Sequence, residues 1–136
     1  MKKLLIILIA ACAWSCSSSG PAPDSALTVQ VRLGTPQSNA PASARLWVWA
    51  HTGVAPGSAA ELLFGELAGE PPLISQTSVN GTFSHNLPAG EYLVAVMLGD
   101  ASEGRYSFLV RQLFAGAPAT LTKVFVASEP VEFEEW

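Results

Sequence analysis

Short runs in which apolar and polar residues alternate are the feature that most constrains the fold of this chain. In residues 27–33 every second side chain is aliphatic, and in residues 44–51 small or aliphatic residues alternate with Arg, Trp and His. Because successive side chains of a strand point to opposite faces, this period of two predicts half-buried strands. Further strands are expected at residues 73–77, 82–87, 92–98, 106–114 and 119–127.

Turn-forming residues separate these runs. Asn80-Gly81 is a strong turn dipeptide, and Gly, Pro, Ser and Asn residues cluster in other gaps. About seven strands at this spacing are typical of an all-β domain. We therefore predict an all-β fold over residues 27–127, a small antiparallel β-sandwich of Ig-like or prealbumin-like type.

One segment between the second and third runs breaks the alternation. Ser58, followed three residues later by Glu61, forms a capping-box signature ahead of a group of apolar residues. We predict a short helical insertion over residues 58–68 that ends at Gly69. Gly65 would then lie inside the helix, where glycine costs about 1 kcal/mol relative to alanine.

The first 16 residues have the pattern of an export signal. Lys2 and Lys3 precede an apolar stretch at residues 4–11, which is far shorter than the roughly 20 residues that a membrane-spanning helix needs. Two cysteines follow, at Cys12 and Cys16.

This segment resembles the bacterial lipoprotein signal, in which small residues precede a cysteine that is acylated and becomes the mature N-terminus. Residues 9–12 (Ile-Ala-Ala-Cys) match the motif, but leave a signal shorter than the roughly 15 residues expected. Residues 13–16 (Ala-Trp-Ser-Cys) give a better length, with a bulky Trp14 where the family has a small residue. The resemblance implies a lipid anchor at Cys16, which is slightly favoured, or at Cys12. An ordinary secretory signal is the alternative.

The lipid anchor implies an exported protein held at a membrane of the cell envelope, and the outer membrane if the cell is Gram-negative. Residues 17–26 are predicted to be a flexible tether, because they offer almost no large apolar side chains to offset the entropy of ordering. The acidic tail, residues 128–136, alternates acidic residues with apolar ones and either docks on a sheet edge or frays.

The charge balance excludes nucleic acid as a partner. The formal net charge is −4, and without Lys2 and Lys3 the chain has five basic and eleven acidic residues. A phosphate-binding surface needs clustered cations. The remaining basic residues are scattered singly, as Arg32, Arg45, Arg105, Arg111 and Lys123.

Residues 80–96 combine a turn glycine, a phenylalanine and a Leu-Pro-x-Gly-x-Tyr turn that leads into a Val-rich strand. This pattern resembles the carboxypeptidase regulatory-like and transthyretin-like β-sandwich repeats, which are mostly non-catalytic modules for folding support, adhesion or carbohydrate-related assembly. Gly90 is expected to permit the tight reversal, while Phe83, Leu87 and Tyr92 close the end of the core.

Trp47 and Trp49 are the strongest candidate binding residues. The resemblance implies that Ala44, Leu46 and Val48 point inward, so both tryptophans, with Arg45 and His51, lie on the opposite face of the strand. Two indoles two positions apart would form a flat exposed platform for a sugar ring or a partner. The alternative is that the helical insertion, whose apolar residues need a surface to cover, packs over them.

No catalytic or metal-binding arrangement is evident in the sequence. His51 and His85 are the only histidines, and neither has a Cys, Asp or Glu at ligand spacing. His85 shares the inward side of its strand with Phe83 and Leu87, and we expect a hydrogen-bonded core residue. We predict a non-enzymatic binding or structural domain without a cofactor, whose partner is an envelope protein or a glycan. A carbohydrate-binding module that uses the tryptophan pair is the alternative.

Overall fold

The computed structural model describes residues 22–99, 104–128 and 131–136. The two candidate lipidation sites, Cys12 and Cys16, lie outside the described residues, as does the first part of the predicted tether.

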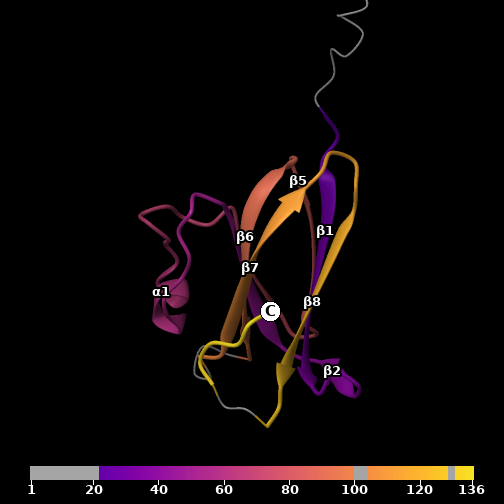
Figure 1. Ribbon diagram of the computed structural model, residues 1–136, viewed down its shortest axis with the longest axis vertical. Coiled ribbons are helices and arrows are strands. Elements are labelled where there is room, and N and C mark those ends of the chain that lie inside the picture. The colour runs from indigo at the N-terminus through magenta and orange to yellow at the C-terminus, as the bar shows by residue number, and fades with distance from the viewer. Residues whose placement is uncertain (1–21, 100–103, 129–130) are drawn as a thin grey trace, which may run out of the picture.

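Eight strands form two four-stranded sheets that lie face to face (Figure 1). The first sheet contains β1 (Ser25–Gly34), β2 (Asn39–Pro41), β5 (Thr82–Leu87) and β8 (Ala119–Val126). The second has the order β4 (Ile74–Ser78), β3 (Ala44–Ala50), β6 (Gly90–Leu98) and β7 (Tyr106–Leu113). A short helix, α1 (Ala59–Phe64), lies outside the second sheet. The predicted β-sandwich with one short helical insertion is confirmed.

Each of the seven runs predicted to be strands forms one. The eighth strand, β2, was missed because it has only three residues and ends in a proline, which is a weak strand signal. β1 begins at Ser25, so the last two residues of the segment predicted to be a tether, 17–26, belong to the first sheet.

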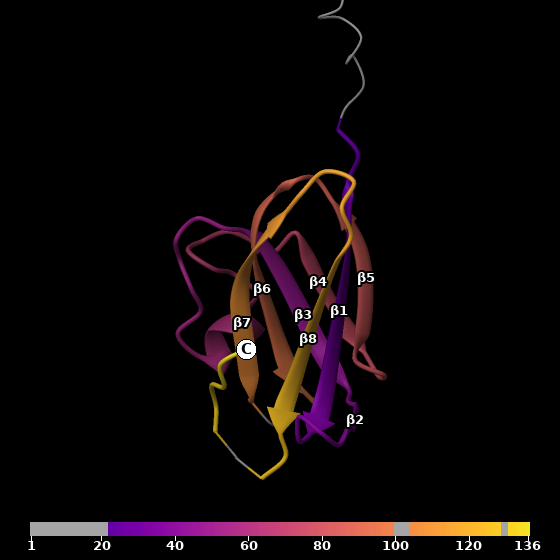
Figure 2. The same cartoon turned by 45° about the vertical axis from the view of Figure 1, so that its right-hand side comes forward.

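One strand pair departs from the antiparallel arrangement predicted for the sandwich. β1 and β8 run parallel, with Leu27 opposite Ala119 and Gly34 opposite Val126. Figure 2 shows the two arrows side by side and pointing the same way. Alternation within a run determines which side chains face inward, but not which strand becomes the neighbour or in which direction it runs.

The core lies between the sheets and is built from the inward side chains that alternation predicts. Phe83, Leu46 and Phe125 are among the largest side chains that are fully buried there. Its other buried members are Leu27, Val29, Val31, Ala44, Val48, Leu87, Tyr92, Val94, Val96, Leu98, Leu113, Ala119 and Leu121. Burying each large aliphatic or aromatic side chain contributes about 1.5–3 kcal/mol, so this layer is the main source of stability.

The helix begins as predicted and ends earlier. The Ser58 hydroxyl accepts a hydrogen bond from the Glu61 backbone N–H at 3.2 Å, and the Glu61 carboxylate accepts one from Gly57 N–H at 2.8 Å. Gly65 has φ 85° and caps the C-terminus, with its N–H bound to the Leu62 carbonyl. The predicted end at Gly69 is therefore wrong, because glycine adopts this left-handed conformation readily and terminates helices there. No helix among the described residues is long and apolar enough to cross a membrane.

The turn at Asn80-Gly81 is confirmed and requires glycine. Gly81 has φ 68°, and a Cβ built there would lie 2.3 Å from the Ala42 carbonyl oxygen and 2.4 Å from that of Val31. The next reversal differs from expectation, because Gly90 is absent from the residues with positive φ and opens β6. Here the Tyr92 hydroxyl donates a 2.6 Å hydrogen bond to the Pro88 carbonyl.

The C-terminal residues 131–136 dock on the sandwich. Docking, the first of the two alternatives for the tail, is therefore confirmed for this part of it. Phe133 forms a parallel bridge with Tyr106 at the start of β7, and their rings lie 5.3 Å apart. The Trp136 indole donates a hydrogen bond to the Thr122 carbonyl of β8. The segment therefore crosses from one sheet to the other and ties their edges together.

Glu134 holds this crossing segment in place electrostatically. Its carboxylate lies 3.0 Å from an Arg105 guanidinium nitrogen and 3.2 Å from Lys123 Nζ. Lys123 is buried on the inward side of β8, with its ammonium over the Phe125 ring. A buried ammonium needs such a partner, because leaving it unpaired away from water is unfavourable.

Candidate functional site

The outer face of the second sheet carries a second apolar cluster, separate from the core between the sheets. Strand register places Trp47 opposite Ala95 and Trp49 opposite Leu93. The buried members of this outer cluster are Trp47, Trp49, Ala59, Leu62, Leu67, Leu93, Ala95, Met97 and Tyr106. The outward orientation predicted for the two tryptophans is confirmed.

The insertion between β3 and β4 covers the two tryptophans. Leu62 of α1 and Leu67 of the following loop pack in the same cluster, which leaves Trp47 0% and Trp49 4% exposed. The prediction of an exposed aromatic platform is therefore wrong, and the alternative of coverage by the insertion is confirmed. A short helix with apolar side chains gains stability only by burying them on a surface such as this.

A tight turn holds the loop of the insertion against Trp49. Leu67 and Glu70 exchange two backbone hydrogen bonds of 3.0 Å, and the Trp49 indole N–H donates a 3.1 Å bond to the Glu70 carbonyl. Both central residues have positive φ, 53° at Ala68 and 78° at Gly69. Alanine in this region is strained by roughly 1–2 kcal/mol, so packing of the turn on Trp49 must offset that strain.

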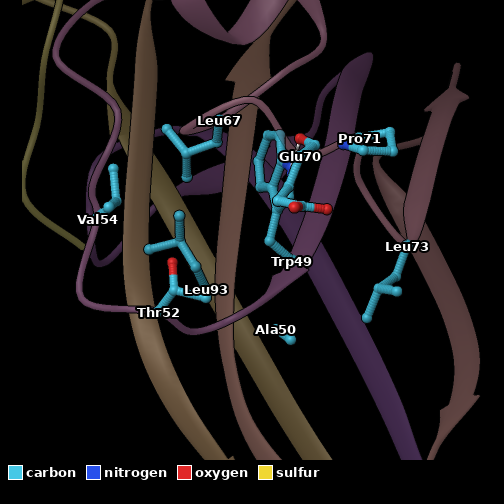
Figure 3. A pocket seen from close by; sticks show the side chains of 9 residues that line it. All are labelled: Trp49, Ala50, Thr52, Val54, Leu67, Glu70, Pro71, Leu73 and Leu93. Atoms are coloured by element: carbon cyan, nitrogen blue, oxygen red, sulfur yellow. Dashed lines mark hydrogen bonds between the residues drawn. The ribbon is translucent and has the colours of Figure 1, made fainter.

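The cover is incomplete and leaves an apolar pocket of about 220 Å³ beside Trp49 (Figure 3). Its lining residues are Trp49, Ala50, Thr52, Val54, Leu67, Glu70, Pro71, Leu73 and Leu93. Leu67 from the loop and Leu93 from β6 point toward one another in Figure 3. At the rim, Val54 is 37% and Leu73 58% exposed. The pocket can therefore admit a small apolar group from solvent.

One acidic residue lines this pocket, and a second lies on the same strand as the lining residue Leu93. Glu70 lines the pocket, and its carboxylate takes part in no salt bridge among the described residues. Glu91, two positions before Leu93 on the same face of β6, has a half-exposed carboxylate 3.5 Å from His51 Nε2. The backbone N–H of His51 is bound to the Glu91 carbonyl at 2.9 Å.

The four predicted binding residues share one face but do not form one site. Trp49 lines the pocket, and His51 directly follows its lining residue Ala50. Arg45 lies five positions before Ala50 on the same strand, about 16 Å away. Its guanidinium stacks 4.9 Å from the centre of the buried Trp47 ring.

The sequence analysis missed the pocket residues contributed by the insertion. Val54, Leu67, Glu70, Pro71 and Leu73 lie in irregular segments, where no periodicity indicates which side chains converge. The available signal in the sequence was the presence of two aliphatic residues, Val54 and Leu73, in segments otherwise rich in Gly and Pro.

His85 lies elsewhere, at the edge where the two sheets meet. It is half-buried, and its Nε2 is 2.5 Å from the Gln76 side-chain oxygen of β4. The expected hydrogen bond is confirmed, while the expected core position is wrong because the residue lies on the edge strand β5. Over the part of the chain that the structure describes, no three His, Cys, Asp or Glu side chains are grouped to hold a metal ion.

Fold and site together define a small two-sheet β-sandwich with a helical insertion over one outer face and an apolar pocket at the end of that insertion. No family model and no curated protein matches the chain, so the resemblance to carboxypeptidase regulatory-like repeats stays a prediction. A solved structure of a proposed polysaccharide-binding protein (DUF1812) from Bacteroides thetaiotaomicron is similar in fold, with 12% identity and a TM-score of 0.47. The match covers 74% of this chain and 46% of that one, so it spans less than half of that protein's length.

Proposed function

We propose that this chain is an exported lipoprotein, anchored in the cell envelope by an acylated cysteine, whose β-sandwich binds a partner protein without catalysing a reaction. The observation that carries the binding role is the apolar pocket of about 220 Å³ between Trp49, Leu67 and Leu93. Ligand sites are typically concave and mostly apolar, with a few polar groups at fixed positions.

The size of the pocket fits a group no larger than one side chain. An apolar cavity of about 150 Å³ holds benzene, so this pocket has room for a leucine or phenylalanine side chain. Burying one such side chain contributes roughly 1.5–3 kcal/mol, which alone gives only weak binding. A partner with useful affinity must therefore add contacts around the rim.

A protein partner is favoured over a glycan. Sugar rings stack on open aromatic faces, and the tryptophans expected to supply them are 0% and 4% exposed. The carbohydrate-binding alternative therefore loses the platform on which it was based, while a side chain needs only the apolar pocket.

Titration with N-acetyl-leucine amide, followed by ¹H–¹⁵N NMR, tests the binding role. We expect saturable shifts of the backbone amides of Thr52, Leu67 and Leu93. Val54→Asp should abolish these shifts, because a carboxylate at the rim disfavours entry of an apolar group. Val79→Asp is the matched control, since Val79 is 88% exposed in the turn after β4 and outside the pocket.

The result for these variants decides the proposal. It is supported if the wild-type chain and Val79→Asp bind with the same affinity while Val54→Asp does not. It fails if the wild-type chain shows no saturable shifts, or if Val54→Asp binds as well as the wild-type chain.

The anchor is supported by the sequence pattern of residues 1–16 and is tested by mass spectrometry of the mature N-terminus. We expect an acylated Cys16, which Cys16→Ala should eliminate and Cys12→Ala should leave intact. If acylation is lost only in Cys12→Ala, the acylated residue is Cys12 and not Cys16. A mature N-terminus that is an unmodified Ser or Ala would contradict the lipoprotein assignment.

A further inference from the structure

Glu70 presents a carboxylate to the pocket from a fixed backbone. Its carbonyl accepts hydrogen bonds from the Trp49 indole and from Leu67 N–H, and its own N–H donates to the Leu67 carbonyl. The carboxylate itself is exposed and contacts no cation among the residues that the structure describes. The anchored backbone fixes the point from which the side chain extends, so only the side-chain torsions of Glu70 remain to be ordered on binding.

No cation of the described chain faces the open end of the pocket. Arg32 is bound to Asn39 in the first sheet, and Arg105 and Lys123 are paired with Glu134. The other two cations of the described chain are Arg45 and Arg111. Arg45 lies at the far end of β3. Arg111 pairs with Tyr92, which belongs to the inner core, so it lies on the other face of the sheet.

The site therefore combines an apolar pocket that Glu70 lines with a second carboxylate, Glu91, two residues before Leu93 on the same face of β6. Among the described residues, His51 lies 3.5 Å from Glu91 and forms no salt bridge with Glu70. A ligand that fills the pocket places its flanking atoms beside Glu70. Charges of opposite sign at such a position strengthen binding and speed encounter, while like charges oppose it.

The geometry points to a peptide segment in which an apolar side chain is followed directly by a lysine or arginine. The apolar side chain occupies the pocket and the neighbouring cation pairs with Glu70. This inference rests on the proposed binding function of the same pocket and names the chemistry of its partner.

Three blocked dipeptides that differ only in the charge of the second residue test the inference. The probes are acetyl-Leu-Lys-amide, acetyl-Leu-Gln-amide and acetyl-Leu-Glu-amide, titrated against the full chain by NMR at low salt. We expect the lysine peptide to bind about threefold to fivefold more tightly than the glutamine peptide, as for one exposed ion pair, and the glutamate peptide to bind most weakly.

Glu70→Gln should remove the preference, so that the lysine peptide binds no more tightly than the glutamine peptide. Glu66→Gln is the matched control, because Glu66 is exposed in the same insertion and does not line the pocket. High salt should reduce the preference in the wild-type chain, since screening weakens exposed ion pairs.

The outcomes separate this inference from the proposed function. Equal binding of all three peptides overturns the inference of a cationic ligand, while the apolar pocket remains the proposed binding site. A preference that persists in Glu70→Gln or disappears in Glu66→Gln overturns the role of Glu70. If no peptide binds and N-acetyl-leucine amide also fails, the proposed function falls as well.

Discussion

The two faces of the second sheet bury apolar side chains in different ways. Its inner face packs against the strands of the other sheet. Leu46, Val48 and Val94 on this face are completely buried. Its outer face is covered by α1 and a loop, and this cover leaves an open pocket beside Trp49 with Val54 and Leu73 exposed at the rim. A regular sheet seals an apolar layer along its whole length, whereas one short helix and a loop do not.

This difference separates the main source of stability from the proposed binding site. The inner layer is formed by residues far apart in sequence and should unfold only with the whole domain, whereas the outer cover has few buried contacts and can open locally. Binding sites are commonly found in such irregular covers, which a rigid scaffold positions. The following predictions test this division between the two layers, from the largest expected effect to the smallest.

Phe125→Ala should have the largest effect. Phe125 is completely buried between the sheets, and truncation of a buried phenylalanine costs about 3–5 kcal/mol in lost burial and cavity formation. Urea unfolding measures the loss. Phe64→Ala, at a site 79% exposed on α1, should change the free energy of unfolding by less than about 0.5 kcal/mol. Similar losses in the two variants would contradict the assignment of Phe125 to the main core.

Leu62→Ala should act mainly on the outer layer. Leu62 anchors α1 on the tryptophan cluster, and its truncation should weaken this contact by about 2–3 kcal/mol. Hydrogen exchange should become faster in residues 57–70 and stay slow in β1 and β8. Uniformly faster exchange in both sheets would mean that the insertion and the sandwich unfold as one unit.

Glu134→Gln should destabilise the C-terminal segment that connects the edges of the two sheets. The substitution removes the negative charge that pairs with both Arg105 and Lys123. We expect the free energy of unfolding, measured with urea, to fall by about 2 kcal/mol. Adding Lys123→Met should recover part of the loss, because no buried ammonium is then left without a partner. A double variant as unstable as the sum of the single variants would refute this coupling.

Ala68→Gly should give the smallest effect, with the opposite sign. Relief of the left-handed strain at Ala68 gains about 1–2 kcal/mol, and the greater flexibility of unfolded glycine costs about 1 kcal/mol. The net expectation is a gain of about 0.5 kcal/mol in the unfolding free energy, visible as a higher Tm. A lower Tm would mean that the turn is not strained at this residue.

The sequence was sufficient to predict the inner layer because alternation specifies which side chains of a strand share a face, and the resemblance to β-sandwich repeats indicated which face of β3 points inward. It correctly placed Leu46 and Val48 inward and Trp47 and Trp49 outward. It was not sufficient to identify β8 as a neighbour of β1, since this parallel pairing joins segments some 90 residues apart. The pocket was missed for a related reason, because irregular segments position its walls through contacts with Trp49 that no local pattern encodes.

Intermolecular NOEs between N-acetyl-leucine amide and the methyl groups of the chain test the central claim most directly. The leucine methyls of the bound probe should show NOEs to the methyl groups of Leu67 and Leu93, and these should vanish in Val54→Asp and persist in Val79→Asp. Saturable binding with NOEs only to residues outside the pocket, such as Val110, would contradict the assignment of the binding site.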